Sequence, residues 1–240
     1  MQKVTGFIVS LLCQFPLRVT SFNYFLLYRY FALHKPFNVL SQFTSQEGKK
    51  CLKDFFSVPR DVYPVGRLDY DSEGLLVATN DPRVTSELLH PSRGHERAYW
   101  VQVEGIITPG ALESLRKGVD IQVKGQSFHT LPCEAQLIAP PGEVGERNPP
   151  IRYRKSVPDC WIELIIKEGK NRQVRKMTAK VGYPTLRLIR WRIGDLTLSA
   201  LGQGEMMELS QPELYKLLRI NKNQPYATIN DRIRKGRTDR

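Results

Sequence analysis

Residues 66–76 read GRLDYDSEGLL, with an arginine ahead of the first of two aspartates and an apolar run after the second. The apolar run continues to Asn80 as GLLVATN, which is typical of a buried strand. Taken alone, the pattern leaves two interpretations of Asp69 open. It is either the working carboxylate of an active site or a turn residue between two strands.

Start and stop signals predict the elements around this stretch. Thr108 and Pro109 precede ALESLRK, which Gly118 ends, so a capped helix is expected there. Asp81 and Pro82 open a second helix in the same way. About five helices and about eight strands are expected in all, and because they do not alternate regularly the predicted fold class is α+β. Further strands are predicted at 98–105, 133–138, 160–167 and 185–193.

Positive charge is abundant and uneven. The chain of 240 residues carries 36 Lys and Arg against 24 Asp and Glu, a formal net charge of +12. Between Arg147 and Arg192 thirteen basic residues face three acidic ones, a net +10, and residues 221–240 add +4. A solvated basic face would account for any one such run, but clustering of this kind favours a polyanionic partner such as nucleic acid.

Other classes of protein find little support. The four cysteines form no CxxC and no ligand pair with the four histidines, so reduced thiols of a cytoplasmic protein are expected rather than structural zinc. The uncharged stretch TGFIVSLLCQFPL (Thr5–Leu17) is too short to span a bilayer and lacks a small-residue cleavage site. A peripheral helix or a start codon placed too far upstream are its alternative explanations. No helix-turn-helix or zinc-finger pattern supports DNA binding.

The second informative stretch is ELIIKEGKNRQVRKMTAKVGYP, residues 163–184. It predicts a strand, a glycine-containing turn and a helix from about Arg172 that Gly182 ends. The helix would be amphipathic, with Arg175 at the boundary between its two faces. An ordinary helix with a wet basic side remains open. The apolar face holds Val174, Met177 and Val181, and the basic face holds Arg172, Lys176 and Lys180.

Four motifs in this order carry a family resemblance: LHKPFNVLSQF (33–43), GRLDYDSEGLLVATN (66–80), RAYWVQVEG (97–105), and EGKNRQVRKM (168–177) with VGYPTLRLIR (181–190). From about Tyr30 to Gly202 the chain resembles the pseudouridine synthases that act on bacterial ribosomal RNA. The resemblance implies the pseudouridine synthase fold, a mixed, mostly antiparallel central sheet in two subdomains that flank an active-site cleft. The implied catalytic domain is 29–220, without an S4-like domain, between an extension of uncertain structure at 1–28 and a basic tail at 221–240 that we expect to be disordered.

The resemblance also implies roles for single residues. Asp69 corresponds to the essential catalytic carboxylate, and Arg175 to the basic residue that pairs with it and keeps it ionised. Tyr99 corresponds to a tyrosine that stacks on the target uracil, with its hydroxyl a candidate for proton transfer. Arg67 corresponds to the arginine that fills the gap left when the target nucleotide swings out of the RNA. Asp71 and Glu73 are expected only to cap the turn and the segment after it.

The implied function is isomerisation of a specific uridine in 23S rRNA to pseudouridine, without metal or organic cofactor. The partner would be 23S rRNA or the pre-ribosomal large subunit, met by a monomer in the cytoplasm and without a membrane. The alternative is a catalytically inactive rRNA-binding protein of ribosome assembly with the same fold. The residues expected to bind RNA, besides Arg67, are Arg152, Arg154, Arg172, Lys176, Arg187, Arg190 and Arg192.

Overall fold

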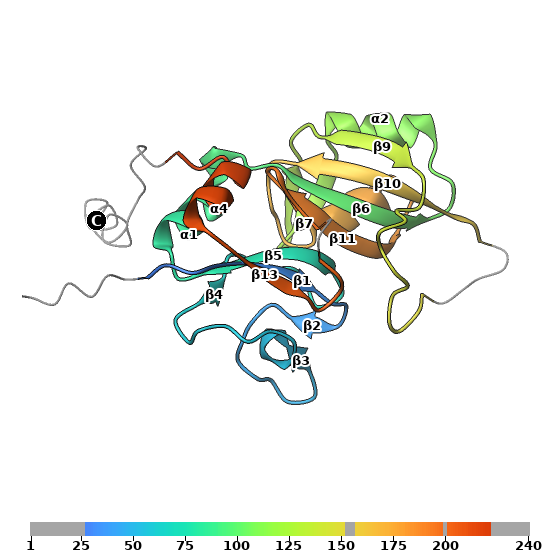
Figure 1. The fold of residues 1–240 in the computed structure, drawn as a ribbon. Helices are drawn as coiled ribbons and strands as arrows, with labels where there is room; N and C mark the ends of the chain where they lie inside the picture. The colour runs from blue at the N-terminus through green and yellow to red at the C-terminus, as the bar shows by residue number, and fades with distance from the viewer. Residues whose placement is uncertain (1–26, 152–156, 199–200, 222–240) are drawn as a thin grey trace, which may run out of the picture.

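A central nine-stranded sheet organises the protein (Figure 1). The structure is a computed structural model and describes residues 27–151, 157–198 and 201–221. Most strand pairs are antiparallel, whereas β5 and β11 run parallel. In sheet order the strands are β13 (Met206–Leu209), β1 (Tyr30–Lys35), β5 (Glu73–Thr79), β11 (Thr185–Ile193), β6 (Arg97–Glu104), β10 (Asp159–Ile166) and β9 (Glu134–Ile138), with β12 (Leu196–Thr197) on β11 and β4 (Tyr63–Pro64) on β5.

Four α-helices and two small sheets complete the described part of the chain. Helix α2 packs along β9, while β2 and β3 lie at the other end of the molecule (Figure 1). The helices are α1 (Pro82–Leu89), α2 (Pro109–Lys117), α3 (Gln173–Lys180) and α4 (Gln211–Leu217), with short 3₁₀ turns η1 (Leu52–Asp54) and η2 (Pro91–Arg93). The small sheets pair β2 (Val39–Leu40) with β3 (Lys50–Cys51) and β7 (Asp120–Val123) with β8 (Gln126–His129).

The parallel seam between β5 and β11 depends on one glycine. Gly74 lies opposite Arg190 and has a φ of +113°. A Cβ atom at Gly74 would lie 2.3 Å from the carbonyl oxygen of Arg190, so no other residue fits without moving backbone. The sequence around Asp69 is thereby joined to the basic strand β11, which lies more than a hundred residues later.

Three groups of buried side chains stabilise the two ends of the sheet. The first packs α1 and α4 against the sheet, the second lies beneath α2 and α3, and the third lies beneath β2 and η1. Burial of this much apolar surface is the main stabilising contribution. Val65 and Leu88 of the first group and Val174 and Leu188 of the second line one cleft, which therefore lies where the two cores meet.

The predicted fold class, α+β with a mixed and mostly antiparallel sheet, is confirmed. Both capped helices occur as expected: Asp81 caps α1, and Thr108 caps α2, which Gly118 ends. Two-residue strands such as β2 were not predicted, because they are too short for an alternating pattern. No described helix is long and apolar enough to cross a membrane. The predicted segments 1–28 and 221–240 fall almost wholly outside the described residues.

Candidate active site

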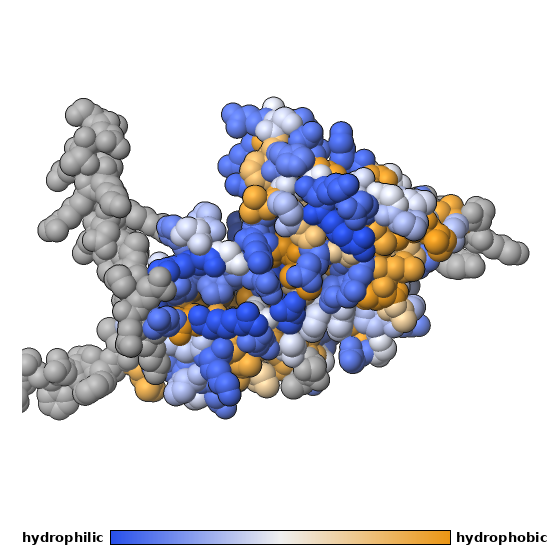
Figure 2. Space-filling view, turned by 90° about the horizontal axis from the view of Figure 1, so that it is seen from above, coloured by the Kyte–Doolittle hydropathy of each residue, from blue (hydrophilic) through white to orange (hydrophobic). Residues whose placement is uncertain are grey.

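A cleft of about 590 Å³ opens between the two main cores. That volume is in the range of sites that enclose a small ligand. Its walls come from the turn at 65–70, the segment at 169–174, and strands β6 and β11. Seen from above, the molecule is hollowed between two lobes, and hydrophilic residues predominate around the hollow (Figure 2).

Asp69 lies on a turn whose backbone is held by hydrogen bonds. The hydroxyl of Ser41 accepts a hydrogen bond from the Leu68 amide (3.0 Å) and donates one to the Leu68 carbonyl (2.8 Å), and the amide of Ser72 donates to the Asp69 carbonyl at 3.1 Å. The Asp69 side chain remains 34% exposed. The backbone at Asp69 is thus held in place, while the carboxylate is open to the cleft. The only signal for Ser41 in the sequence was its place in the motif at 33–43, because its contact with Leu68 spans 27 residues.

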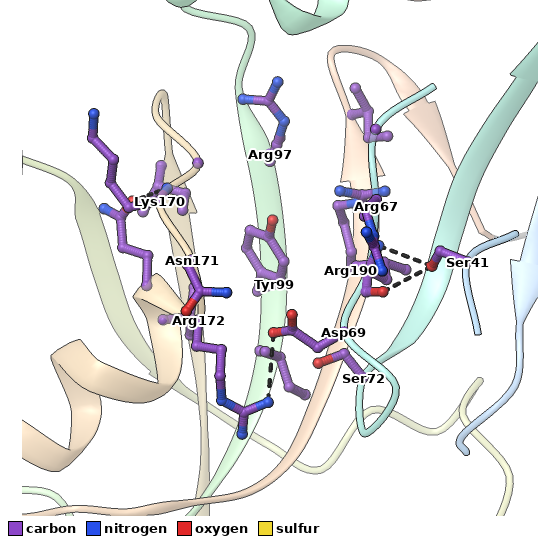
Figure 3. Close-up of a pocket in the computed structure, with 18 of the residues that line it drawn as sticks. Ser41, Arg67, Asp69, Ser72, Arg97, Tyr99, Lys170, Asn171, Arg172 and Arg190 are labelled. Atoms are coloured by element: carbon purple, nitrogen blue, oxygen red, sulfur yellow. Dashed lines mark hydrogen bonds and ion pairs between the residues drawn. The ribbon is translucent and has the colours of Figure 1, made fainter. Parts of the chain in front are cut away.

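Tyr99 projects from β6 into the same space. Its side chain belongs to the cleft wall, its residue is 8% exposed, and Figure 3 shows the ring above the Asp69 carboxylate. Arg190 lies beside it, directly opposite on β11. In Figure 3, Arg172 flanks Asp69 on one side, with Arg67 and Arg190 on the other. Asp69, Tyr99, Arg67, Arg172 and Arg190 therefore all line one cleft.

The two arginines at the start of α3 make a different contact from the predicted one. Arg172, which occupies the N-cap position of α3 with a left-handed φ of 52°, donates from both terminal nitrogens to the Asp71 carboxylate, each at 2.8 Å. Arg175 donates to the Asp71 carbonyl at 2.5 Å, and its Nε lies 3.5 Å from Asp71 Oδ2. The ion pair with Asp69 belongs to Arg172, at 3.8 Å. The expected Arg175–Asp69 pair is absent from the contacts of these described residues.

Asp71 is therefore more than the turn cap that we expected. Burial would raise the pKa of its carboxyl, but the hydrogen bonds from Arg172 and the charges of Arg175 and Arg172 outweigh burial and hold that pKa below its usual range. Burial lowers the pKa of Arg175, and the Asp71 carboxylate opposes that shift. The turn thus carries two carboxylates two residues apart: Asp69 lines the cleft, and Asp71 beside it accepts the hydrogen bonds of the arginines.

Arg187 does not belong to an RNA-binding rim. Its side chain is 5% exposed and its guanidinium donates to both oxygens of Glu73, at 2.9 and 2.8 Å, and to the Gly145 carbonyl at 3.0 Å. A phosphate could reach it only if this buried pair opened. The prediction for Arg187 is wrong because its strand position faces the protein interior. Glu73, expected to cap a segment, is the partner of this pair.

The remaining predicted RNA-binding residues differ in exposure. Arg67 is exposed at the cleft, and Lys176 is half-buried on α3. Arg192 is tied to the Gly194 carbonyl (2.7 Å) and lies 3.6 Å from Glu96. Arg190 is buried and donates from Nε to the Leu75 carbonyl at 2.8 Å, so it contributes to the cleft wall rather than to an outer surface. Arg152 and Arg154 lie outside the described residues.

A buried lysine near the cleft was not predicted. Lys35, the lysine of the KPFNVL stretch, is 0% exposed and donates to the carbonyls of Pro36 (2.9 Å) and Val39 (2.7 Å). Burial lowers its pKa to about 7, although the charges of Glu73, Asp71 and Asp69 oppose that shift. Its place in a quoted motif was the only signal in the sequence. Within the described ranges, no three His, Cys, Asp or Glu side chains are grouped to hold a metal ion.

Comparison with known proteins agrees with this geometry. A family model described as RNA pseudouridylate synthase matches residues 29–180. The ribosomal large subunit pseudouridine synthase E of Vibrio vulnificus (strain CMCP6) is 48% identical over 179 residues, which cover 75% of this chain and 74% of that protein. The protein of the same name from Xanthomonas axonopodis pv. citri (strain 306) is 49% identical over 171 residues, covering 70% of this chain and 87% of that protein.

A likeness in structure accompanies the likeness in sequence. The crystal structure of a pseudouridylate synthase matches with a TM-score of 0.63 at 26% identity, covering 79% of this chain and 74% of that one. The family match extends over more than half of the chain and includes the turn at Asp69, the strand of Tyr99 and helix α3. The protein therefore belongs to the RNA pseudouridylate synthase family.

Proposed function

We propose that the protein converts a specific uridine of 23S rRNA to pseudouridine, with Asp69 as the essential carboxylate. One observation supports this above all: Asp69 is held by its backbone in an open cleft, facing the ring of Tyr99 and flanked by arginine. The ribosomal large subunit in the names of its relatives supports the choice of substrate, either as naked rRNA or as an assembling particle.

The chemistry requires little beyond these side chains. The bond between C1′ of the sugar and N1 of uracil breaks, a bond from C1′ to C5 forms, C5 loses a proton and N1 gains one. A carboxylate can add to an electrophilic carbon and leave again, or remove a proton from a sugar intermediate. Tyr99 supplies a stacking surface for the uracil while it is detached. Because electrons and atoms balance within one nucleotide, we expect turnover without a cofactor.

Access to the uridine requires that the nucleotide leave its RNA stack. Arg67, exposed at the mouth of the cleft, is the side chain that we assign to the vacated position. Arg172 and Lys176 on α3 are the described residues that we assign to phosphate contacts, which position RNA but do not select a base. Arg187 is removed from that set because it is buried against Glu73.

The deciding experiment replaces Asp69 by asparagine, which keeps size and polarity and removes the carboxylate. Full-length proteins would be incubated with a 23S rRNA transcript carrying tritium at C5 of uridine, and both tritium release and the modified position would be recorded. We expect wild type to modify one uridine and Asp69→Asn to fall to background, with RNA affinity within a few-fold. Tyr99→Phe should keep stacking and lose any contribution of the hydroxyl.

Asp120→Asn is the matched control, because Asp120 is a 64% exposed aspartate on β7. It should behave as wild type. A protein that binds the transcript but modifies no uridine, on naked rRNA or on assembling particles, would favour the catalytically inactive assembly factor. Turnover by Asp69→Asn at even a few per cent of the wild-type rate would exclude Asp69 as the essential group.

A further inference from the structure

The turn that presents Asp69 also presents a carboxylate that the proposed reaction does not use. Asp71 is 34% exposed, as Asp69 is, but the two have different partners. Asp71 accepts two hydrogen bonds from Arg172 with its side chain and one from Arg175 with its carbonyl. Within the described part of the chain, the contact given for the Asp69 carboxylate is the 3.8 Å ion pair with Arg172. The pair of arginines is therefore anchored on Asp71, beside the carboxylate at which the chemistry is proposed.

Arg175 has a buried donor at Nε. Its side chain is 13% exposed, and its Nε is buried without a hydrogen-bond partner among the described residues, although Asp71 Oδ2 lies 3.5 Å away. A buried donor without an acceptor is uncommon in folded proteins and calls for an explanation. The oxygen nearest to that nitrogen in the described contacts is Asp71 Oδ2, so the side chain of Arg175, like that of Arg172, is held against Asp71.

We propose that Asp71 is a positioning residue, which holds Arg172 and Arg175 beside Asp69 in advance of the reaction. The inference rests on the proposed function of Asp69. Arginine side chains lose much conformational freedom when they are ordered, and a site ordered beforehand avoids that cost during the reaction. Asp71 also connects the turn to the start of α3, across 101 residues of sequence. It thereby fixes both walls of the cleft relative to each other.

The same carboxylate competes with RNA for Arg172. Each guanidinium nitrogen that donates to Asp71 is unavailable to a phosphate, and the negative charge of Asp71 repels the RNA backbone. Removal of that charge should therefore act in opposite directions on two steps. RNA binding should become tighter and more dependent on salt, while turnover of bound RNA should become slower. A residue that only supported the fold would weaken both steps together.

The test compares wild type with Asp71→Asn, Asp71→Glu and Glu208→Gln. Glu208 is the control because it also binds an arginine, Arg29, through both carboxylate oxygens, on the edge strand β13 and outside the cleft. Two quantities would be measured on full-length protein: the affinity for an rRNA fragment over a range of potassium chloride concentrations, and the single-turnover rate constant at saturating RNA. Thermal unfolding would confirm that each variant is folded.

We expect Asp71→Asn to slow single turnover by roughly 10- to 100-fold, the scale at which misplaced groups affect catalysis. The slope of log affinity against log salt should steepen by about one, because Arg172 becomes free to neutralise a further phosphate. Asp71→Glu keeps the charge and should recover part of the rate and the wild-type salt slope. Glu208→Gln should match wild type in both quantities.

Two results would overturn the inference: an Asp71→Asn protein with the wild-type rate and salt slope, or one with weaker RNA binding and a lowered unfolding temperature, which would indicate a structural role alone. A wrong assignment of the proposed function would give a different experimental result. In that case wild type would form no pseudouridine, while the salt slopes would still report whether Asp71 holds Arg172.

Discussion

Two arginine–carboxylate pairs join the turn region at 66–76 to the basic region at 172–192, and their hydrogen-bond lengths are nearly the same. Arg187 binds both oxygens of Glu73 at 2.9 and 2.8 Å, and Arg172 binds both oxygens of Asp71 at 2.8 Å. Their surroundings differ. The side chains of the first pair are 5% and 1% exposed, whereas those of the second are 42% and 34% exposed.

This difference in burial separates a pair that supports the fold from one that can serve a site. A buried ion pair cannot exchange partners without leaving a charge unpaired in a medium of low dielectric. A half-exposed pair gains only modest net stability, so either member can turn to a phosphate or a substrate at little cost. The same kind of ion pair therefore supports the fold where it is buried and can serve a binding site where it is half-exposed.

The largest effect should follow from breaking the buried pair. Arg187→Met leaves the Glu73 carboxylate buried without its partner, and we expect a loss of about 3–5 kcal/mol in the free energy of unfolding. Replacement of both residues by methionine should recover much of that loss, since no buried charge remains unpaired. Urea unfolding of wild type, Arg187→Met, Glu73→Met and the double variant measures the coupling free energy between the two residues. A folded, fully stable Arg187→Met protein with weakened RNA binding would restore Arg187 to the RNA-binding rim.

Lys35 is a buried charge whose hydrogen bonds in the described part of the chain go to carbonyl groups, so its contribution to the free energy of unfolding should depend on pH. The folded pKa of Lys35, about 7, lies below its ordinary value, so the unfolded chain binds the proton more tightly and protonation favours unfolding. Relative to Lys35→Met, wild type should be least stable below about pH 7 and gain roughly 2 kcal/mol between about pH 6 and pH 9. Unfolding free energies at several pH values test this. A pH-independent difference would mean that Lys35 titrates normally.

The smallest effect on stability, with a clear effect on binding, should come from the exposed pair. Arg172→Gln should change the free energy of unfolding by less than about 1 kcal/mol. Because Asp71 then loses its hydrogen bonds from Arg172 and repels the RNA backbone, the change should weaken RNA binding about tenfold, and in the Arg172→Gln background Asp71→Asn should no longer steepen the salt slope. Lys117→Gln on α2, whose side chain is 75% exposed, controls for loss of a surface charge and should leave binding unchanged. A loss of several kcal/mol in the free energy of unfolding of Arg172→Gln would show that burial does not distinguish the contributions of the two ion pairs to stability.

Local signals predicted the elements well where their physical causes are local. Thr108, Pro109 and Gly118 mark the ends of α2 because caps and φ preferences act within a single turn. The bounds predicted for β11, 185–193, agree with the structure because its apolar and basic residues form one continuous run. The motif order also indicated which residues would share a cleft, and Asp69 and Tyr99 do share it.

Contacts between distant segments were predicted less well. Strand β11 has register shifts between Thr185 and Arg187 and again between Arg190 and Arg192, so counting alternate residues cannot assign each arginine to a face. Burial of Arg187 depends on Glu73, 114 residues earlier. The partner of Arg175 was expected to be Asp69, and it is Asp71, a choice between two carboxylates on one turn that sequence spacing does not resolve.

The sequence by itself determined the fold class, the ends of the capped helices and the candidate residues for the site, because these follow from local propensities and ordered motifs. Only the tertiary structure decided which arginine is buried, which carboxylate holds the arginines of α3, and that Lys35 lies with a lowered pKa near the cleft. Burial and pairing depend on how segments about a hundred residues apart pack together, and the electrostatic energy of a charge depends on that packing far more than on its neighbours in sequence.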